Sequence, residues 1–208
     1  MEKDDKKLII PSIASGNLLN ISEDIKFIDI NYGYIHIDIE DGNYIPNITF
    51  GSKLLKLICK NSSSHKSIHL MVNKPEHFLN IIKECKPDVV FIHTDITRYP
   101  SQLIRLYQDE GIKVGIAINP SASIDNIEYI IPLVDDILVM TSEPDRRDQR
   151  YIAFVEEKIR RLNNYKVNIW VDGGVTESQI KNLFGMGVKN IVMGRAVFND
   201  RNRIIRTK

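Results

Sequence analysis

Residues 89–118 read VVFIHTDITRYPSQLIRLYQDEGIKVGIAI. Two short apolar runs, Val89–His93 and Val114–Ile118, flank an amphipathic segment, Ser101–Glu110. Near-continuous apolar runs rich in β-branched residues are typical of strands that are buried on both faces, as in parallel sheets. Gly111 directly follows the amphipathic segment and suits the end of a helix. The stretch therefore predicts a strand, a helix and a second, parallel strand.

The same alternation continues in both directions along the chain. Strands that alternate with helices predict repeated β–α–β units, and eight such units close into a barrel. We therefore predict a single (β/α)8 TIM barrel, an α/β fold, formed as one domain by residues 1–208. The eight predicted strands are Leu8–Ile13, Tyr34–Ile39, Ser67–Met71, Val89–His93, Val114–Ile118, Asp136–Met140, Val167–Val171 and Asn190–Met193. Predicted helices between them include Ile21–Ile30, Glu76–Glu84, Ser101–Glu110, Phe154–Leu162 and Glu177–Gly185.

The composition of the chain argues against nucleic acids and membranes as binding partners. The 208 residues include 28 Lys and Arg against 27 Asp and Glu, a formal net charge of +1, which argues against nucleic acid as a partner. No apolar run is long enough to span a bilayer, so we expect no membrane partner. The N-terminal MEKDDKK is charged and lacks the apolar segment of a signal peptide, so we expect a cytoplasmic protein. Cys59 and Cys85 form no CxxC pair, and we expect buried, inert thiols.

Two histidines and two aspartates fall where three predicted strands end. His36 and Asp38 alternate along one strand and so point to the same side, His69 lies near the end of the next, and Asp172 precedes Gly173-Gly174. A lone inward histidine is usually a core residue, and a lone aspartate before two glycines usually forms a turn. Active residues of barrels gather at the carboxyl ends of strands, however, and four polar groups buried there need a partner. The set suits one divalent metal ion, Zn²⁺, Mn²⁺, Fe²⁺ or Co²⁺.

Several motifs, in order along the chain, resemble the ribulose-phosphate 3-epimerase family. The most specific are DGNYIPNITFG at Asp41–Gly51, which follows His36-Ile37-Asp38, and HLMV at His69–Val72. The matches span almost the whole chain. The others are Ile10-Pro11-Ser12-Ile13, Ala117-Ile118-Asn119-Pro120, Val139-Met140-Thr141, Val171-Asp172-Gly173-Gly174 and Gly194-Arg195-Ala196-Val197-Phe198.

The resemblance implies a metal-dependent isomerase. It would invert C3 of a ketose phosphate, either D-ribulose 5-phosphate and D-xylulose 5-phosphate or a related pentulose or hexulose phosphate. Asp38 and Asp172 match the family's two acid/base carboxylates, and together with His36 and His69 they match its metal ligands. A metal that binds the substrate oxygens would stabilise the enediolate formed when the C3 proton leaves. We expect a small-molecule sugar phosphate as partner, and a homo-oligomer.

Other positions are expected to line the substrate pocket, and His69 is expected to contact the substrate as well as the metal. Ser12 matches a family serine beside the sugar hydroxyls, although it could equally cap a strand end. Met71 and Met140 match methionines above the metal, a role that rests on the resemblance because methionine is usually core filler. His93 also faces the mouth, and we expect it to support the site rather than bind the metal. Backbone N–H groups of Gly173, Gly174 and Gly194 would bind phosphate, as loops after the last two strands of barrels often do.

Three departures from the family pattern surround the predicted substrate. Arg195 replaces a serine, and Glu40 replaces a methionine beside the metal. The loop Pro144–Gln149 reads PDRRDQ instead of PGFGGQ, so Arg146, Arg147 and Arg195 could help to hold phosphate as planar donors. These changes leave the four predicted ligands intact. They favour a substrate other than D-ribulose 5-phosphate, such as a hexulose 6-phosphate.

Two other functions fit the sequence less well. A phosphate-binding decarboxylase barrel needs an Asp-x-Lys-x-x-Asp array, and the third predicted strand ends in HLM without a lysine. A non-catalytic regulatory barrel that binds sugar phosphates would agree with the altered loop at Pro144–Gln149. Such a binder has no need for two opposed carboxylates, which favours the enzyme.

Overall fold

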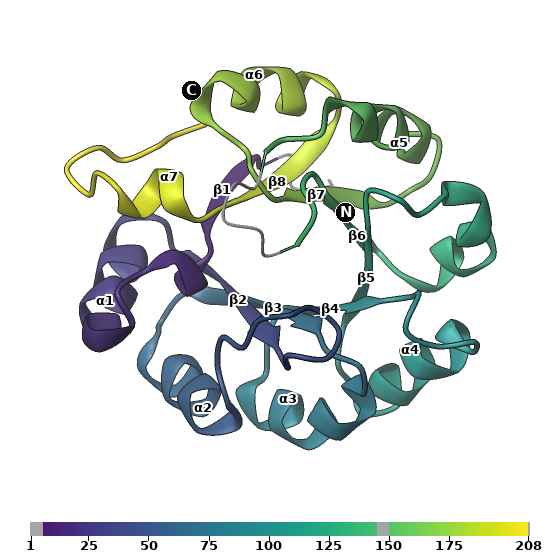
Figure 1. Cartoon of the computed structure of the whole chain (residues 1–208), viewed down its shortest axis with the longest axis horizontal. Coiled ribbons are helices and arrows are strands. Elements are labelled where there is room, and N and C mark those ends of the chain that lie inside the picture. The colour runs from purple at the N-terminus through teal and green to yellow at the C-terminus, as the bar shows by residue number, and fades with distance from the viewer. Residues whose placement is uncertain (1–5, 145–149, 208) are drawn as a thin grey trace.

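The computed structural model describes residues 6–144 and 150–207. Its strands form one parallel eight-stranded sheet in the order β1-β8-β7-β6-β5-β4-β3-β2. A parallel bridge between Ser12 and His36 joins the two outer members of this order, so the sheet closes into a barrel with helices around it (Figure 1). The prediction of a (β/α)8 TIM barrel is confirmed. The strands are β1 (Leu8–Pro11), β2 (Tyr34–Glu40), β3 (His65–Met71), β4 (Val89–His93), β5 (Val114–Ile118), β6 (Asp136–Met140), β7 (Asn168–Asp172) and β8 (Val188–Met193).

The outer layer consists of short helices. Between β5 and β6 the chain forms only the 3-10 helices Ile124–Asn126 and Glu128–Leu133, the second of which contains Pro132, a residue without an N–H donor. Within the described residues, no helix has the length and apolar character needed to cross a membrane. The α-helices are α1 (Ile21–Asn31), α2 (Ser52–Asn61), α3 (Leu79–Cys85), α4 (Pro100–Gln108), α5 (Glu156–Leu162), α6 (Glu177–Gly185) and α7 (Arg195–Phe198).

Some predicted boundaries were wrong by one to three residues. β1 ends at Pro11 instead of Ile13, because the chain turns into a 3-10 helix in which Ser15 N–H donates to the Ser12 carbonyl. The helix predicted at 76–84 begins as a 3-10 helix over Pro75–Phe78 before α3 starts. Of the two cysteines expected to be buried, Cys85 is buried and Cys59 is partly exposed.

Apolar side chains fill the barrel interior and form the floor of its mouth. Phe91 and Trp170 meet edge to face, with 5.0 Å between their ring centroids, and Trp170 Nε1 donates to Asp136 at 2.8 Å. Gly115 leaves space for Phe91, since a Cβ at this position would lie 2.4 Å from the phenyl ring. This floor keeps the polar groups above it in one layer. The interior cluster comprises Ile10, Val89, Phe91, Ala117, Leu138, Met140, Trp170 and Val192.

The tight contact at Gly115 predicts a large effect of one methyl group. Gly115→Ala should lower the free energy of unfolding by about 1 to 3 kcal/mol, the usual cost of overpacking a core. Gly185→Ala, a matched change in α6 where an added Cβ meets nothing within 4 Å, should leave stability unchanged or raise it by up to about 1 kcal/mol. Urea denaturation of both variants measures the difference. Equal stabilities would show that the barrel floor is loosely packed.

Candidate active site

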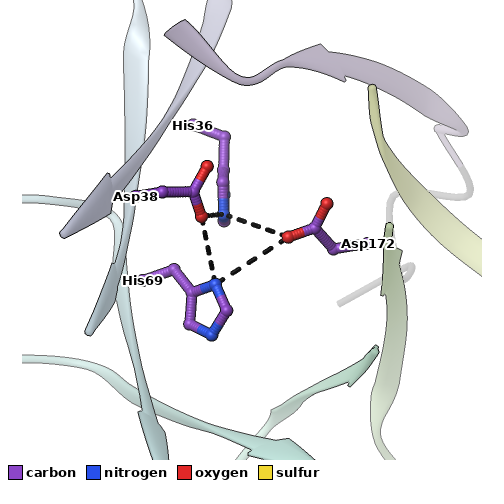
Figure 2. A group of neighbouring side chains, drawn as sticks. All are labelled: His36, Asp38, His69 and Asp172. Atoms are coloured by element: carbon purple, nitrogen blue, oxygen red, sulfur yellow. Dashed lines mark hydrogen bonds and ion pairs between the residues drawn. The ribbon is translucent and has the colours of Figure 1, made fainter. Parts of the chain in front are cut away.

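The four predicted metal ligands meet at the mouth of the barrel. Asp38 Oδ1 lies 3.2 Å from His36 Nε2 and 3.1 Å from His69 Nδ1, while Asp172 Oδ2 lies 4.0 and 3.8 Å from the same two nitrogens. One ligand atom from each residue falls within 4.8 Å of the other three. Figure 2 shows Asp172 approaching from the side opposite Asp38, with the histidine nitrogens between them.

Strand register explains this convergence. Asp38 on β2 pairs with His69 on β3, so the two side chains share one layer of the barrel, and His36 lies two residues earlier on the same inward face. Asp172 ends β7, where it pairs with Met140 of β6. Residues from nearly opposite walls therefore point at one spot.

The arrangement fits a divalent cation. His36 Nε2 is buried and has no hydrogen-bond partner among the described residues, although it points at the two carboxylates. Its other ring nitrogen, Nδ1, lies 2.8 Å from Ser67 Oγ, which leaves Nε2 available as a ligand. Two imidazoles and two carboxylates suit Zn²⁺, Mn²⁺, Fe²⁺ or Co²⁺, and the ligand set alone does not select one of them.

The two carboxylates differ in their affinity for a proton. Burial, together with the negative charge of Asp38, raises the pKa of Asp172 to about 7. Burial also acts to raise the pKa of Asp38, but the electrostatic attraction and close side-chain contacts of His36 and His69 outweigh it and hold this pKa below its usual range. Two neighbouring carboxylates whose pKa values are pushed apart are typical of an acid and a base that work together.

The loop after β2 folds back over the mouth. Asp41 Oδ1 accepts hydrogen bonds from the backbone N–H groups of Asn43 and Tyr44, at 2.8 and 2.9 Å. Thr49 Oγ1 donates to the Asp38 carbonyl at 2.7 Å, and Asn47 Nδ2 donates to Glu40 Oε2 at 2.6 Å. The DGNYIPNITFG segment is therefore hydrogen-bonded to β2, the strand that carries His36 and Asp38.

A cavity of about 910 Å³ opens above the cluster. Each substrate-binding residue predicted from the sequence lines it except His69, which is fully buried beneath. Ser12 Oγ lies 2.5 Å from Asp38 Oδ2, so it contacts an acid/base carboxylate as well as the cavity. The predicted residues on the wall are Ser12, Met71, Met140, Gly173, Gly174, Gly194 and Arg195.

Other lining residues were missed by the sequence analysis. Asn47 and Thr49 belong to the quoted DGNYIPNITFG motif, which could have indicated them, whereas Ser15, Thr176 and Asn199 carry no such signal. Glu40 also lines the cavity and is buried. The cavity wall is therefore more polar than the predicted set alone.

The predicted phosphate end follows β7 and β8. Gly173 and Gly174 have φ angles of +111° and +66°, a region that favours glycine, and a Cβ on Gly173 would lie 2.3 Å from Ser142 Oγ. Arg195, the first residue of α7, is exposed at the cavity edge. Arg146 and Arg147 lie outside the described residues.

A barrel whose mouth holds two opposed carboxylates and two histidines has the features of a TIM-barrel enzyme. The profile of the ribulose-phosphate 3-epimerase family matches residues 8–198, and the chain belongs to this family, whose members are isomerases. The ribulose-phosphate 3-epimerase of Helicobacter pylori is 28% identical over 201 residues, which cover 94% of this chain and 92% of that protein. The Synechocystis enzyme of the same name is 32% identical, with coverages of 94% and 89%.

Solved structures agree on the fold. A mutant tryptophan synthase α-subunit from Pyrococcus furiosus superposes with a TM-score of 0.71 over 95% of this chain and 90% of its own. At 15% identity this likeness shows the barrel fold alone.

The geometry predicts one divalent cation per chain. Protein purified without chelator should contain about one equivalent by elemental analysis, and His69→Ala should lose most of it because removal of one of four ligands weakens the site. His65→Ala, a change of an exposed histidine on the same strand, is the control and should keep its metal. Full occupancy and full activity in His69→Ala would contradict the four-ligand site.

Proposed function

We propose that the chain is a metal-dependent epimerase that inverts C3 of a ketose phosphate by two-base proton transfer. Candidate substrates are the pair D-ribulose 5-phosphate and D-xylulose 5-phosphate, or a related pentulose or hexulose phosphate. The observation that carries the proposal is the opposition of Asp38 and Asp172 across the histidine pair (Figure 2). Inversion through a planar enediolate needs one proton-transfer group on each face, and these two carboxylates supply them.

The protonation states support this assignment. At neutral pH Asp38, with its lowered pKa, is ionised and can accept the C3 proton. Asp172, with a pKa of about 7, can carry a proton to return to the other face. In the reverse direction the roles exchange. A cation bound by the four side chains would supply Lewis-acid stabilisation of the enediolate.

Neighbouring residues would orient the carboxylates and limit the access of water to them. The hydroxyl of Ser12 holds Asp38 Oδ2, which limits the rotation of the carboxylate. Met71 and Met140, both buried, line the cavity and would help to exclude water from the reacting carbon. Exclusion of water matters because electrostatic stabilisation is stronger in a medium of low dielectric constant.

A substrate other than D-ribulose 5-phosphate is supported by Glu40. Its side chain is buried at the cavity wall, two residues beyond Asp38 on the same inward face, and Asn47 holds one of its oxygens. A carboxylate at this position accepts hydrogen bonds from sugar hydroxyls, whereas methionine does not. Arg195 adds a cation at the edge where phosphate would bind. A hexulose 6-phosphate, with one more hydroxyl than a pentulose phosphate, fits both changes. The cytoplasmic location and the homo-oligomer stay predictions.

The two-base mechanism predicts the effect of two isosteric changes. Asp38→Asn and Asp172→Asn should each lower kcat for epimerisation by about 10²- to 10⁴-fold, the usual contribution of a positioned acid or base. Metal content is measured alongside activity, because both residues are also proposed ligands. A variant that keeps its metal should still exchange the C3 proton of one epimer with solvent. Turnover near the wild-type rate in either variant would contradict the assigned roles.

The substrate proposal predicts a change of preference. Wild-type protein should show a higher kcat/KM for a hexulose 6-phosphate than for D-ribulose 5-phosphate, and Glu40→Met should reduce that ratio about 10-fold or more, as expected when a hydroxyl loses a buried partner. Arg195→Ser should raise KM, whereas Arg203→Ser, an exposed arginine paired with Glu177, should not. The proposal fails if D-ribulose 5-phosphate is preferred and Arg195→Ser leaves KM unchanged.

A further inference from the structure

We propose that His93 is a positioning residue that fixes the tautomer of His69, so that Nδ1 of His69 faces the metal site. The inference rests on the proposed metal centre but concerns a residue that has no ligand atom in it. His93 ends β4, next to the strand that carries His69. Its Nε2 lies 2.9 Å from His69 Nε2, on the side of the His69 ring away from the carboxylates.

Proton counting on the two rings gives the direction of this hydrogen bond. Two imidazole nitrogens 2.9 Å apart need one donor and one acceptor. His69 Nδ1 lies 3.1 Å from Asp38 Oδ1 and 3.8 Å from Asp172 Oδ2, so it is the atom aimed at the cation. A metal ligand must offer a lone pair, which places the His69 proton on Nε2. His69 therefore donates and His93 Nε2 accepts.

The surroundings of His93 keep it a neutral acceptor. The residue is 1% exposed, and burial disfavours the charged form of an imidazole. Among the described residues its Nδ1 has no hydrogen-bond partner, so no neighbouring donor opposes a proton on this atom. A metal-binding histidine commonly donates its other ring N–H to a carboxylate or a backbone carbonyl. A neutral imidazole does this here without adding negative charge beside Asp38 and Asp172.

A contact with Tyr44, itself held by hydrogen bonds, supports the His93 ring. The Tyr44 ring packs on it, with 4.8 Å between ring centroids. Tyr44 Oη in turn donates to Asp95 Oδ1 at 3.1 Å and accepts from Asn119 Nδ2 at 2.6 Å. The loop after β2 and the ends of β4 and β5 are thus joined around His93. The packing of Tyr44 against the His93 ring limits the rotation of that ring.

The other proposed histidine ligand, His36, faces the carboxylates with the opposite ring nitrogen. Ser67 Oγ lies 2.8 Å from His36 Nδ1, and His36 Nε2 faces the carboxylates. His36 should therefore carry its proton on Nδ1, whereas His69 should carry its proton on Nε2. This difference gives a spectroscopic signature that a purely structural role for His93 does not require.

The tautomers can be read directly. The chain has five histidines, so ¹⁵N-histidine labelling and two-bond ¹H–¹⁵N correlation spectra of the Zn²⁺-loaded protein should resolve each ring. We expect protonated Nε2 and metal-bound Nδ1 for His69, with the reverse for His36. A His69 ring protonated at Nδ1, or bound to Zn²⁺ through Nε2, would overturn the proposal. Failure to bind Zn²⁺ at all would instead contradict the metal centre itself.

A pair of variants separates hydrogen bonding from packing. His93→Phe keeps an aromatic ring against Tyr44 but removes the acceptor, and it should weaken Zn²⁺ binding about 10- to 100-fold in chelator competition. His93→Gln restores a neutral acceptor and should recover most of that affinity. His65→Phe, the same change at an exposed site on β3, should bind as the wild type does. Wild-type affinity in His93→Phe, or equal losses in the Phe and Gln variants, would contradict the positioning role.

Discussion

The burial of two carboxylates and two histidines within one small volume is the constraint on which the rest of the structure depends. Isolated buried charges cost several kcal/mol each, so such a cluster persists only when the groups neutralise one another or bind an ion. Asp38 Oδ1 lies 3.2 Å from His36 Nε2, yet this nitrogen has no hydrogen-bond partner among the described residues. A cation at the centre of the cluster would give each of the four side chains an interaction partner. The same four groups would then serve both binding and proton transfer.

The barrel keeps this cluster in place from below and from above. Below it, Phe91 and Trp170 form a rigid apolar floor, and the Phe91 ring lies 6.4 Å from that of His36. Above it, the loop after β2 returns to the strand that carries His36 and Asp38, through the hydrogen bonds of Thr49 and Asn47. Rigid support on both sides matters because acid/base groups work only when they are held close to their reactive geometry.

The sequence predicted the barrel and the four clustered residues because both follow from local patterns. Apolar runs mark strands, and the period of two places His36 and Asp38 on one face. Partners that depend on folding back of a loop were not predicted, such as the contact of Asn47 with Glu40 or the approach of Ser15 to the cavity. Helix starts near Pro75 were also misjudged, since 3-10 and α-helices share the same apolar spacing over one turn.

The central claim is that two carboxylates act on opposite faces of one carbon. It is tested most directly by converting a ketose phosphate in ²H₂O, with analysis of both epimers at low conversion. Two bases predict that the product carries solvent deuterium at the inverted carbon from the first turnovers, while unreacted substrate stays unlabelled. Product that retains the original hydrogen of the substrate would show transfer by a single group and would contradict the account.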